Sequence, residues 1–163
     1  MTRIGLLSDT HGYLHPRVSD FFKDCDEIWH AGDIGNIEVA EYLSALKPFR
    51  AVYGNIDGGK LRILFNEYLF FTIEKVKVLM IHIGGYPQKY SSHAKRLIAS
   101  HKPQLFISGH SHVLKVMNDD VYGLLHINPG AAGKNGFHRK ITMVRFVIEE
   151  ENIREFEVFE ADR

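Results

Sequence analysis

The sequence predicts an α/β fold in which packed β-sheets are flanked by helices. Two observations favour this fold class. The first third of the chain alternates short apolar runs with helical patterns, which is typical of βαβ units. The rest contains many short segments rich in β-branched residues and one clear helical pattern. The length of 163 residues, of which 45% are hydrophobic, predicts a single domain over residues 1–163.

The first elements are expected to alternate between strand and helix. Apolar runs at 4–8, 27–30 and 50–53 predict strands, and helical patterns lie between them near 17–23 and 37–46. In the middle of the chain, the Leu-, Ile- and Phe-rich segment 61–71 and the alternating segment 72–83 predict neighbouring strands.

A third helix is expected near 91–101, and it should end before Lys102-Pro103, because the residue before a proline disfavours helical geometry. The remaining apolar segments predict further strands at 105–108, 113–117, 122–127, 141–148 and 153–159. The last two flank an acidic turn at 149–152 and predict a hairpin.

Charge and composition exclude several classes of protein. The 20 basic residues balance the 20 acidic ones, so no net charge attracts nucleic acid or an anionic membrane, and neither partner is expected. The longest apolar runs are much shorter than the roughly 20 residues of a membrane-spanning helix. The residues after Met1 lack a signal-peptide pattern, and Cys25 is the single cysteine, so we expect a cytoplasmic protein without disulfides.

Ten histidines are the unusual feature of the composition, because histidine is the commonest metal ligand. Five short segments share one pattern, in which an apolar run ends and metal-binding side chains follow at once. They are Ser8-Asp9-Thr10-His11-Gly12, His30-Ala31-Gly32-Asp33, Gly54-Asn55-Ile56-Asp57, Ile81-His82-Ile83-Gly84 and Ser108-Gly109-His110-Ser111-His112. Ligand sites in such folds form beyond the carboxyl ends of strands, where distant residues converge. The glycines fit tight turns with positive φ or a close approach of phosphate to the backbone.

Taken singly, most of these residues have an ordinary structural explanation, since an Asp before a turn caps a helix and a lone His packs in a core or on a surface. Taken together, they require five independent coincidences at strand ends. The Asp-x-His and His-x-His pairs also place two donors on the same side of an extended segment, which suits chelation.

The ordered set Asp-x-His, Gly-Asp, Gly-Asn-x-Asp, His and Gly-His-x-His resembles the calcineurin-like metallophosphoesterase superfamily from Ser8 to His112. The short chain, the Gly-Asn-Ile-Asp segment and the Asn128-Pro129-Gly130 turn are similar to its small YfcE-like phosphodiesterase branch. The resemblance implies an α/β, four-layer αββα sandwich with two divalent metal ions. Manganese is the expected metal, with nickel, iron, cobalt or zinc as alternatives.

The same resemblance implies a ligand for each motif position. One metal takes Asp9, His11, Asp33 and His112, and the other takes Asp33, Asn55, His82 and His110, so that Asp33 bridges. Catalysis is expected through Asp9, Asp33, Asn55 and His82, which hold the metals and a bridging hydroxide that attacks the phosphoester. The two dications outweigh the negative charges of both aspartates and the hydroxide, so the site should attract a phosphate oxygen. His15 and His30 flank ligand motifs and are expected to support them.

One departure from the family pattern bears on the substrate. Many relatives carry a third-motif histidine that helps the leaving group depart, and Ile56 stands in that position here. We therefore expect a metal-dependent phosphodiesterase acting on small phosphoesters. Three alternatives stay open: a phosphomonoesterase of the same fold, a nuclease, or a non-catalytic metal-binding scaffold that resembles the retromer subunit. A homo-oligomer also stays open.

Overall fold

A computed structural model describes residues 1–163 and contains two five-stranded sheets, a small hairpin and four helices. The first sheet is formed by β1 (Thr2–Leu7), β2 (Glu27–His30), β3 (Phe49–Ala51), β11 (Lys140–Glu149) and β12 (Asn152–Asp162). The second sheet is formed by β4 (Tyr68–Ile73), β5 (Val76–Ile81), β8 (Leu105–Ile107), β9 (Leu114–Asp119) and β10 (Leu124–Pro129). The hairpin pairs β6 (Gly85–Tyr86) with β7 (Lys89–Tyr90). The helices are α1 (Val18–Phe21), α2 (Ile37–Leu46), α3 (Lys60–Leu64) and α4 (Ser92–His101).

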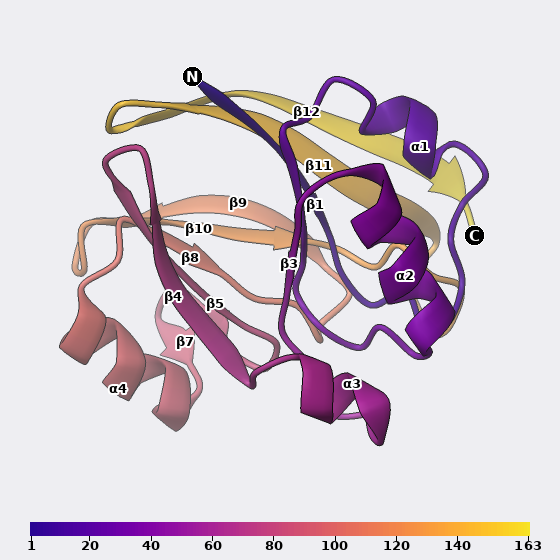
Figure 1. The fold of residues 1–163 in the computed structure, drawn as a ribbon. Helices are drawn as coiled ribbons and strands as arrows, with labels where there is room; N and C mark the ends of the chain where they lie inside the picture. The colour runs from indigo at the N-terminus through magenta and orange to yellow at the C-terminus, as the bar shows by residue number, and fades with distance from the viewer.

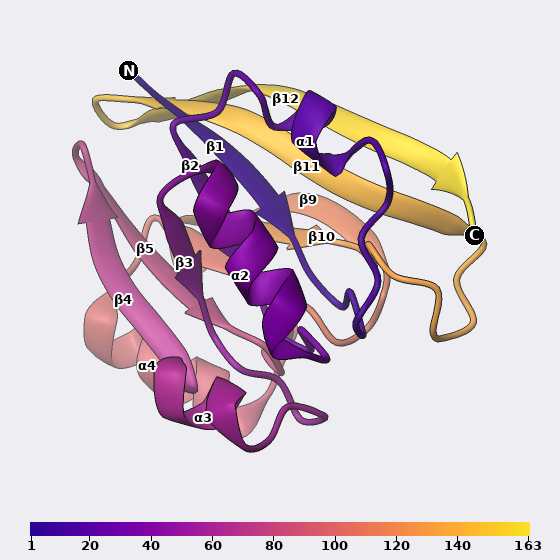
Figure 2. The same ribbon diagram turned by 45° about the vertical axis from the view of Figure 1, so that its right-hand side comes forward.

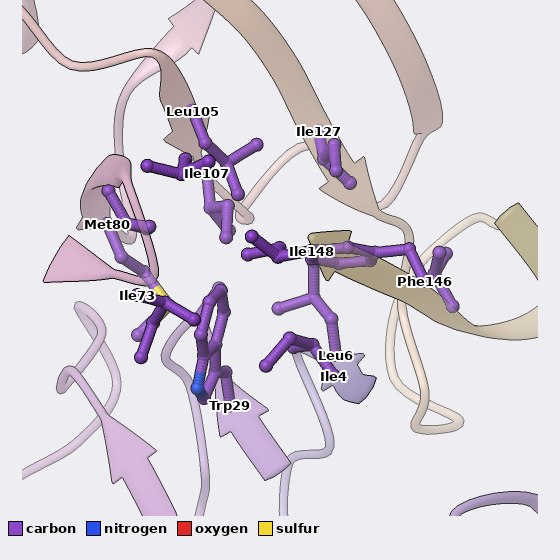
Figure 3. Close-up of a cluster of buried hydrophobic side chains, with 14 of the residues drawn as sticks. Ile4, Leu6, Trp29, Ile73, Met80, Leu105, Ile107, Ile127, Phe146 and Ile148 are labelled. Atoms are coloured by element: carbon purple, nitrogen blue, oxygen red, sulfur yellow. The ribbon is translucent and has the colours of Figure 1, made fainter. Parts of the chain in front are cut away.

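A continuous hydrophobic core joins the two sheets face to face (Figure 3). Its residues come from both sheets, with Ile4 and Val144 on one side and Met80 and Ile107 on the other. Trp29 is fully buried in this core, and its ring makes an edge contact with the ring of Phe71 at 5.0 Å between centroids. Burial of such large side chains between two sheets is the main stabilising term of the sandwich.

Helices α1 and α2 cover the outer face of the first sheet, and α4 covers the outer face of the second (Figures 1 and 2). Val18 of α1 and Leu43 of α2 share a second buried cluster with Ile28 of the first sheet. Ala94 and Ile98 of α4 share a third cluster with strands of the second sheet. The layers therefore run helix, sheet, sheet, helix, which confirms the αββα fold class.

Parallel pairing places one set of strand ends along a common edge. β1, β2 and β3 are parallel neighbours in the first sheet, and β5, β8 and β10 are parallel neighbours in the second. The strand orders are β12-β11-β1-β2-β3 and β4-β5-β8-β10-β9. The loops that follow the parallel strands are therefore positioned to meet, which is where ligand sites form in α/β proteins.

Most expected elements are present, and the segment 61–71 is the main correction. Its first part forms α3 rather than a strand, and the strand β4 begins at Tyr68. The short helix is held by tertiary contacts, because the side chain of Arg62 donates to the carbonyl of Asp57 and its guanidinium lies over the Tyr53 ring. The hairpin β6–β7 was also not expected. None of the helices reaches the length and hydropathy that crossing a membrane requires.

Candidate metal centre

Two groups of candidate metal ligands lie beyond the ends of parallel strands. Each group contains one carboxylate and two imidazoles, whose ligand atoms lie within 4.8 Å of one another. The groups are Asp9, His11 and His112, and Asp33, His82 and His110. These residues follow β1, β2, β5 and β8 in the chain. The structure thus brings together six of the seven expected ligands, divided between two positions as the resemblance implies, and their binding of metal stays a prediction.

Asp9 presents one carboxylate oxygen to the site and uses the other to hold the site's loops. Its Oδ2 accepts hydrogen bonds from the Ser8 hydroxyl at 2.6 Å and from the His110 amide at 3.0 Å. Its Oδ1 lies 3.1 Å from Nε2 of His112 and 3.9 Å from Nε2 of His11. Because Oδ2 is already satisfied, Oδ1 is the oxygen left to bind a cation.

Asp33 belongs to the second group, is arranged in the same way, and also faces the first group. Its Oδ1 accepts the amide of Ile56 at 3.0 Å. Its Oδ2 lies 3.4 Å from Nε2 of His11 and 3.2 Å from Nε2 of His82. One oxygen therefore faces an imidazole from each group, which is the position that a bridging ligand requires.

The buried imidazoles are oriented so that one ring nitrogen of each faces the carboxylates. Nδ1 of His82 donates to the carbonyl of Ala31 at 2.8 Å, and this bond fixes the ring with Nε2 toward Asp33. Nε2 of His82 and Nε2 of His11 are buried and have no hydrogen-bond partner. An unpartnered buried nitrogen is costly unless it binds something, so these two atoms fit a metal ion. The nitrogen and oxygen donors suit the divalent transition metals.

The electrostatics of the two carboxylates favour their ionised forms. Burial opposes ionisation of Asp9, but its interactions with the nearby His11 and His112 imidazoles outweigh it and hold the pKa of Asp9 well below its usual range. Burial likewise opposes ionisation of Asp33, but its interaction with His82 lowers the pKa of that carboxyl. Both aspartates are thus ready to bind cations at neutral pH.

The carboxylates raise the pKa of two imidazoles, whereas the pKa of a third is lowered. The neighbouring Asp9 carboxylate raises the pKa of His11 above its ordinary value. Burial works to lower the pKa of His82, but the neighbouring Asp33 raises it overall. Burial, with His82 nearby, lowers the pKa of His110. Protons therefore compete with a cation mainly at His11 and His82.

Five candidate ligands have left-handed backbone conformations, with φ between 48° and 72°. They are Asp9, His11, Asp33, His110 and His112. Such conformations cost a non-glycine residue about 1–3 kcal/mol and persist where the surrounding structure imposes them. The sequence pattern assigned positive φ to the neighbouring glycines, and Gly12 and Gly32 do have it. The candidate ligands themselves adopt the same left-handed conformation, although they carry side chains.

Other glycines are required for close approach rather than for positive φ. A Cβ atom on Gly109 would overlap the hydroxyl of Ser8, which holds Asp9. A Cβ atom on Gly54 would overlap the carboxylate of Asp33. The loops that bear the candidate ligands are thus packed directly against one another.

Asn55, the seventh expected ligand, lies on the loop after β3. It lines a pocket of about 510 Å³ that also exposes His11, Asp33 and His112. Asp9 faces the imidazoles of His11 and His82, and His82 also faces Asp33. The four residues expected to act in catalysis therefore lie around one site.

Asp57 connects two loops of the site, a role that the sequence analysis does not predict. Its buried carboxylate accepts hydrogen bonds from the amides of Ile34, Gly35 and Gly54. It therefore joins the loop after β2, which carries Asp33, to the loop after β3, which carries Asn55. The sequence signal for this role is the position of the Asp57 carboxylate close to the Gly54-Asn55 turn.

Asn128 and His30 also hold loops of the site. Asn128 donates to the carbonyl of Gly109 at 3.1 Å and to the hydroxyl of Ser111 at 3.0 Å. His30 is fully buried, and its Nε2 lies 2.9 Å from the Thr10 hydroxyl. Burial lowers the pKa of His30 to about 4, so it is neutral at pH 7.

The expectation for His15 is wrong. Its ring lies 5.0 Å from the ring of Phe159, and its Nδ1 accepts the amide of Arg17. This residue therefore packs against β12 and the α1 segment rather than against a candidate ligand.

Curated relatives identify the kind of protein to which this chain is similar. A probable metallophosphoesterase of Methanothermobacter thermautotrophicus is 31% identical over 135 residues, which cover 78% of this chain and 76% of that protein. A probable metallophosphoesterase of Methanocaldococcus jannaschii is 34% identical over 134 residues, covering 78% of this chain and 67% of that protein.

Solved structures share the fold. The structure of an archaeal phosphodiesterase superposes with a TM-score of 0.73 at 22% identity, covering 96% of this chain and 99% of that one. Vps29 of Chaetomium thermophilum superposes with a TM-score of 0.76 at 11% identity and covers 99% of both chains. Vps29 of Entamoeba histolytica in complex with Zn²⁺ gives a TM-score of 0.73 at 17% identity, covering 98% of both.

A family model described as the calcineurin-like phosphoesterase superfamily domain matches residues 2–151, which is nearly the whole chain. The match includes all the strand-end motifs and both groups of candidate ligands. The resemblance deduced from the motif order is confirmed, and this chain belongs to the calcineurin-like phosphoesterase superfamily.

Proposed function

We propose that this protein is a metal-dependent phosphodiesterase with two divalent cations, held by Asp9, His11, Asp33, Asn55, His82, His110 and His112. The observation that carries the proposal is the position of Asp33 Oδ2, which lies 3.4 Å from Nε2 of His11 and 3.2 Å from Nε2 of His82. A carboxylate oxygen that faces both groups would suit a ligand shared by two cations.

Each residue has a definable task in this proposal. Asp9 and Asp33 contribute negative charge, while Ser8 and the amides of Ile56 and His110 hold their second oxygens. When bound, the cations would lower the pKa of a coordinated water and offset charge that develops on the phosphoryl oxygens. Water would attack phosphorus and release a proton to solvent, the ester P–O bond would break, and the departing oxygen would keep the bonding pair.

The diester preference is supported by the charges around the pocket. Neither a lysine nor an arginine lines the pocket that exposes His11, Asp33 and His112. A phosphomonoester carries one more negative charge than a diester at neutral pH, and this pocket offers no lysine or arginine to bind it. The neighbouring pocket that exposes Asn55 and His82 has Arg62, whose guanidinium lies over the Tyr53 ring. Ile56 also offers no proton to a strongly basic leaving group.

A comparison of two aryl esters tests this function. The chelator-treated protein is reloaded with Mn²⁺ or Ni²⁺, and hydrolysis of bis(4-nitrophenyl) phosphate is measured beside that of 4-nitrophenyl phosphate. We expect a higher kcat/KM for the diester. A higher value for the monoester would show a phosphomonoesterase instead, and the response to each metal identifies the cation.

The likeness to Vps29 favours one second candidate, a metal-binding scaffold without turnover. Every candidate ligand position is filled in this chain, which favours the enzyme. Absence of hydrolysis of either ester with any metal would favour the scaffold. A cytoplasmic location belongs to the same proposal and is supported by the single cysteine, Cys25, which is buried and free.

A further inference from the structure

Three exposed apolar side chains surround the open side of the candidate metal centre. Phe137 is completely exposed, Val113 is 55% exposed and Ile56 is 48% exposed. They come from three separate loops, and all three line the same pocket as the candidate ligands. We call Ile56, Val113 and Phe137 the apolar rim.

The position of each rim residue is tied to a candidate ligand. The amide of Ile56 donates to Oδ1 of Asp33. Val113 follows His112 directly in the chain. Phe137 precedes His138, whose ring makes an edge contact with the His112 ring at 5.1 Å between centroids. The rim therefore lies beside the place where a phosphoryl group would bind.

The chemistry of the rim limits what can lie on it. Its side chains offer neither a charge nor a hydrogen bond, so a charged or hydroxyl-rich group would lose hydration without replacement. An apolar group would remove both itself and the rim from water, which is favourable in proportion to the area buried. A flat ring suits the aromatic face of Phe137.

We propose that the apolar rim binds an ester group of the substrate, so that the preferred substrates are phosphodiesters carrying an aromatic or similarly apolar group. This inference rests on the proposed phosphodiesterase function and names its substrate class. The group on the rim is the ester that stays on phosphorus, and the other ester oxygen departs; with Ile56 in place of a proton donor, an aryl oxygen suits that departure because it is weakly basic.

The test compares two substrates that release the same 4-nitrophenolate, phenyl 4-nitrophenyl phosphate and methyl 4-nitrophenyl phosphate. We expect Phe137→Ala to lower kcat/KM for the phenyl ester about tenfold, from the apolar area that is no longer buried. The methyl ester should change by less than about twofold, since a methyl group buries little area. For the phenyl ester, the kcat/KM of Phe137→Leu should lie between those of the unchanged protein and Phe137→Ala.

The matched control is Val121→Ala. Val121 is 85% exposed but lies in the turn between β9 and β10, outside the pocket. The Val121→Ala variant should leave kcat/KM for both the phenyl and the methyl ester unchanged. An equal effect of Phe137→Ala on the two esters, or the same phenyl-specific loss in Val121→Ala, would overturn the proposal.

A binding measurement separates this proposal from the proposed function. Diphenyl phosphate and dimethyl phosphate are titrated into the Zn²⁺-loaded protein, and methyl resonances of Ile56 and Val113 are followed by NMR. Selective binding of diphenyl phosphate with shifts at both residues supports the rim even if no ester is hydrolysed. Hydrolysis combined with equal binding of the two phosphates overturns the rim and leaves the phosphodiesterase function standing.

Discussion

The backbone of Gly54 lies so close to Asp33 that a Cβ atom on residue 54 would overlap Oδ1 of that carboxylate. Gly54 does not have a positive φ, so the requirement for glycine here is space alone. The contact links the loop after β3 to the carboxylate that faces both groups of candidate ligands.

Gly54→Ala should therefore remove metal binding without unfolding the sandwich. The added methyl would overlap both the carboxylate and the backbone nitrogen of Asp33, so Asp33 has to move, and a displacement of about 1 Å is enough to lower activity about a hundredfold. Gly58→Ala is the matched control in the same loop, because no atom lies within 4 Å of a Cβ there. Metal content and hydrolysis of bis(4-nitrophenyl) phosphate are measured for both variants, and equal losses would contradict the prediction.

Replacement of Asp33 should affect both cations, whereas replacement of Asn55 should affect one. Asp33→Ala removes the carboxylate oxygen that lies nearest to both His11 and His82, at 3.4 and 3.2 Å, so we expect loss of both metals and nearly all activity. Asn55→Ala should mainly weaken one site. The measurement is metal stoichiometry after equilibrium dialysis with Mn²⁺, and retention of two ions in Asp33→Ala would remove the bridging assignment.

Metal affinity should fall as the pH drops below about 6.5, because a ligating imidazole must be neutral. The carboxylates beside them raise the pKa of His11 and of His82, so a proton competes with the cation at a higher pH than for a free imidazole. Mn²⁺ titrations at pH 7.5, 5.5 and 4 check this. Undiminished occupancy at pH 4 would show that these rings are not ligands.

The stability of the metal-free protein should also depend on pH through His126. This residue is fully buried, and burial lowers its pKa to about 4. The unfolded chain binds this proton near pH 6.5 whereas the folded chain does not, so stability is full above 6.5 and is lost as the pH falls toward 4. At pH 5 the loss is about 2 kcal/mol, at 1.36 kcal/mol per pKa unit.

Urea unfolding at pH 7 and at pH 5 measures this contribution. In His126→Gln the difference in the free energy of unfolding between the two pH values should shrink by that amount. The His126 ring stacks on Phe106 on the outer face of the second sheet. An unchanged difference would assign the pH dependence to other groups.

The strand and helix pattern could be predicted from local sequence except where tertiary contacts decide. The expected bounds of β2 and α2 agree with the structure, because a period of two or of 3.6 is a local property. The segment at Leu61 could not be read correctly, since the apolar residues of α3 resemble a strand. Contacts of Arg62 with Asp57 and Tyr53 hold it as a helix.

The candidate site could be predicted as a set of residues but not as a geometry. Its motifs identify which side chains bind metals in the family. They do not show that Asp33 turns Oδ1 to the amide of Ile56 and Oδ2 to the imidazoles, or that Asp57 joins two of the loops. Those features depend on how separate loops pack, and the left-handed φ of Asp9 or His112 follows from the same packing.

The division of candidate ligands between the two sheets has a mechanical consequence. Asp9 and Asp33 follow strands of the first sheet, while His82 and His112 follow strands of the second. Each group therefore spans the interface, and a cation held by either group would cross-link the layers at one end. Loading with metal should then raise the melting temperature by mass action, and chelation should loosen that end of the sandwich first.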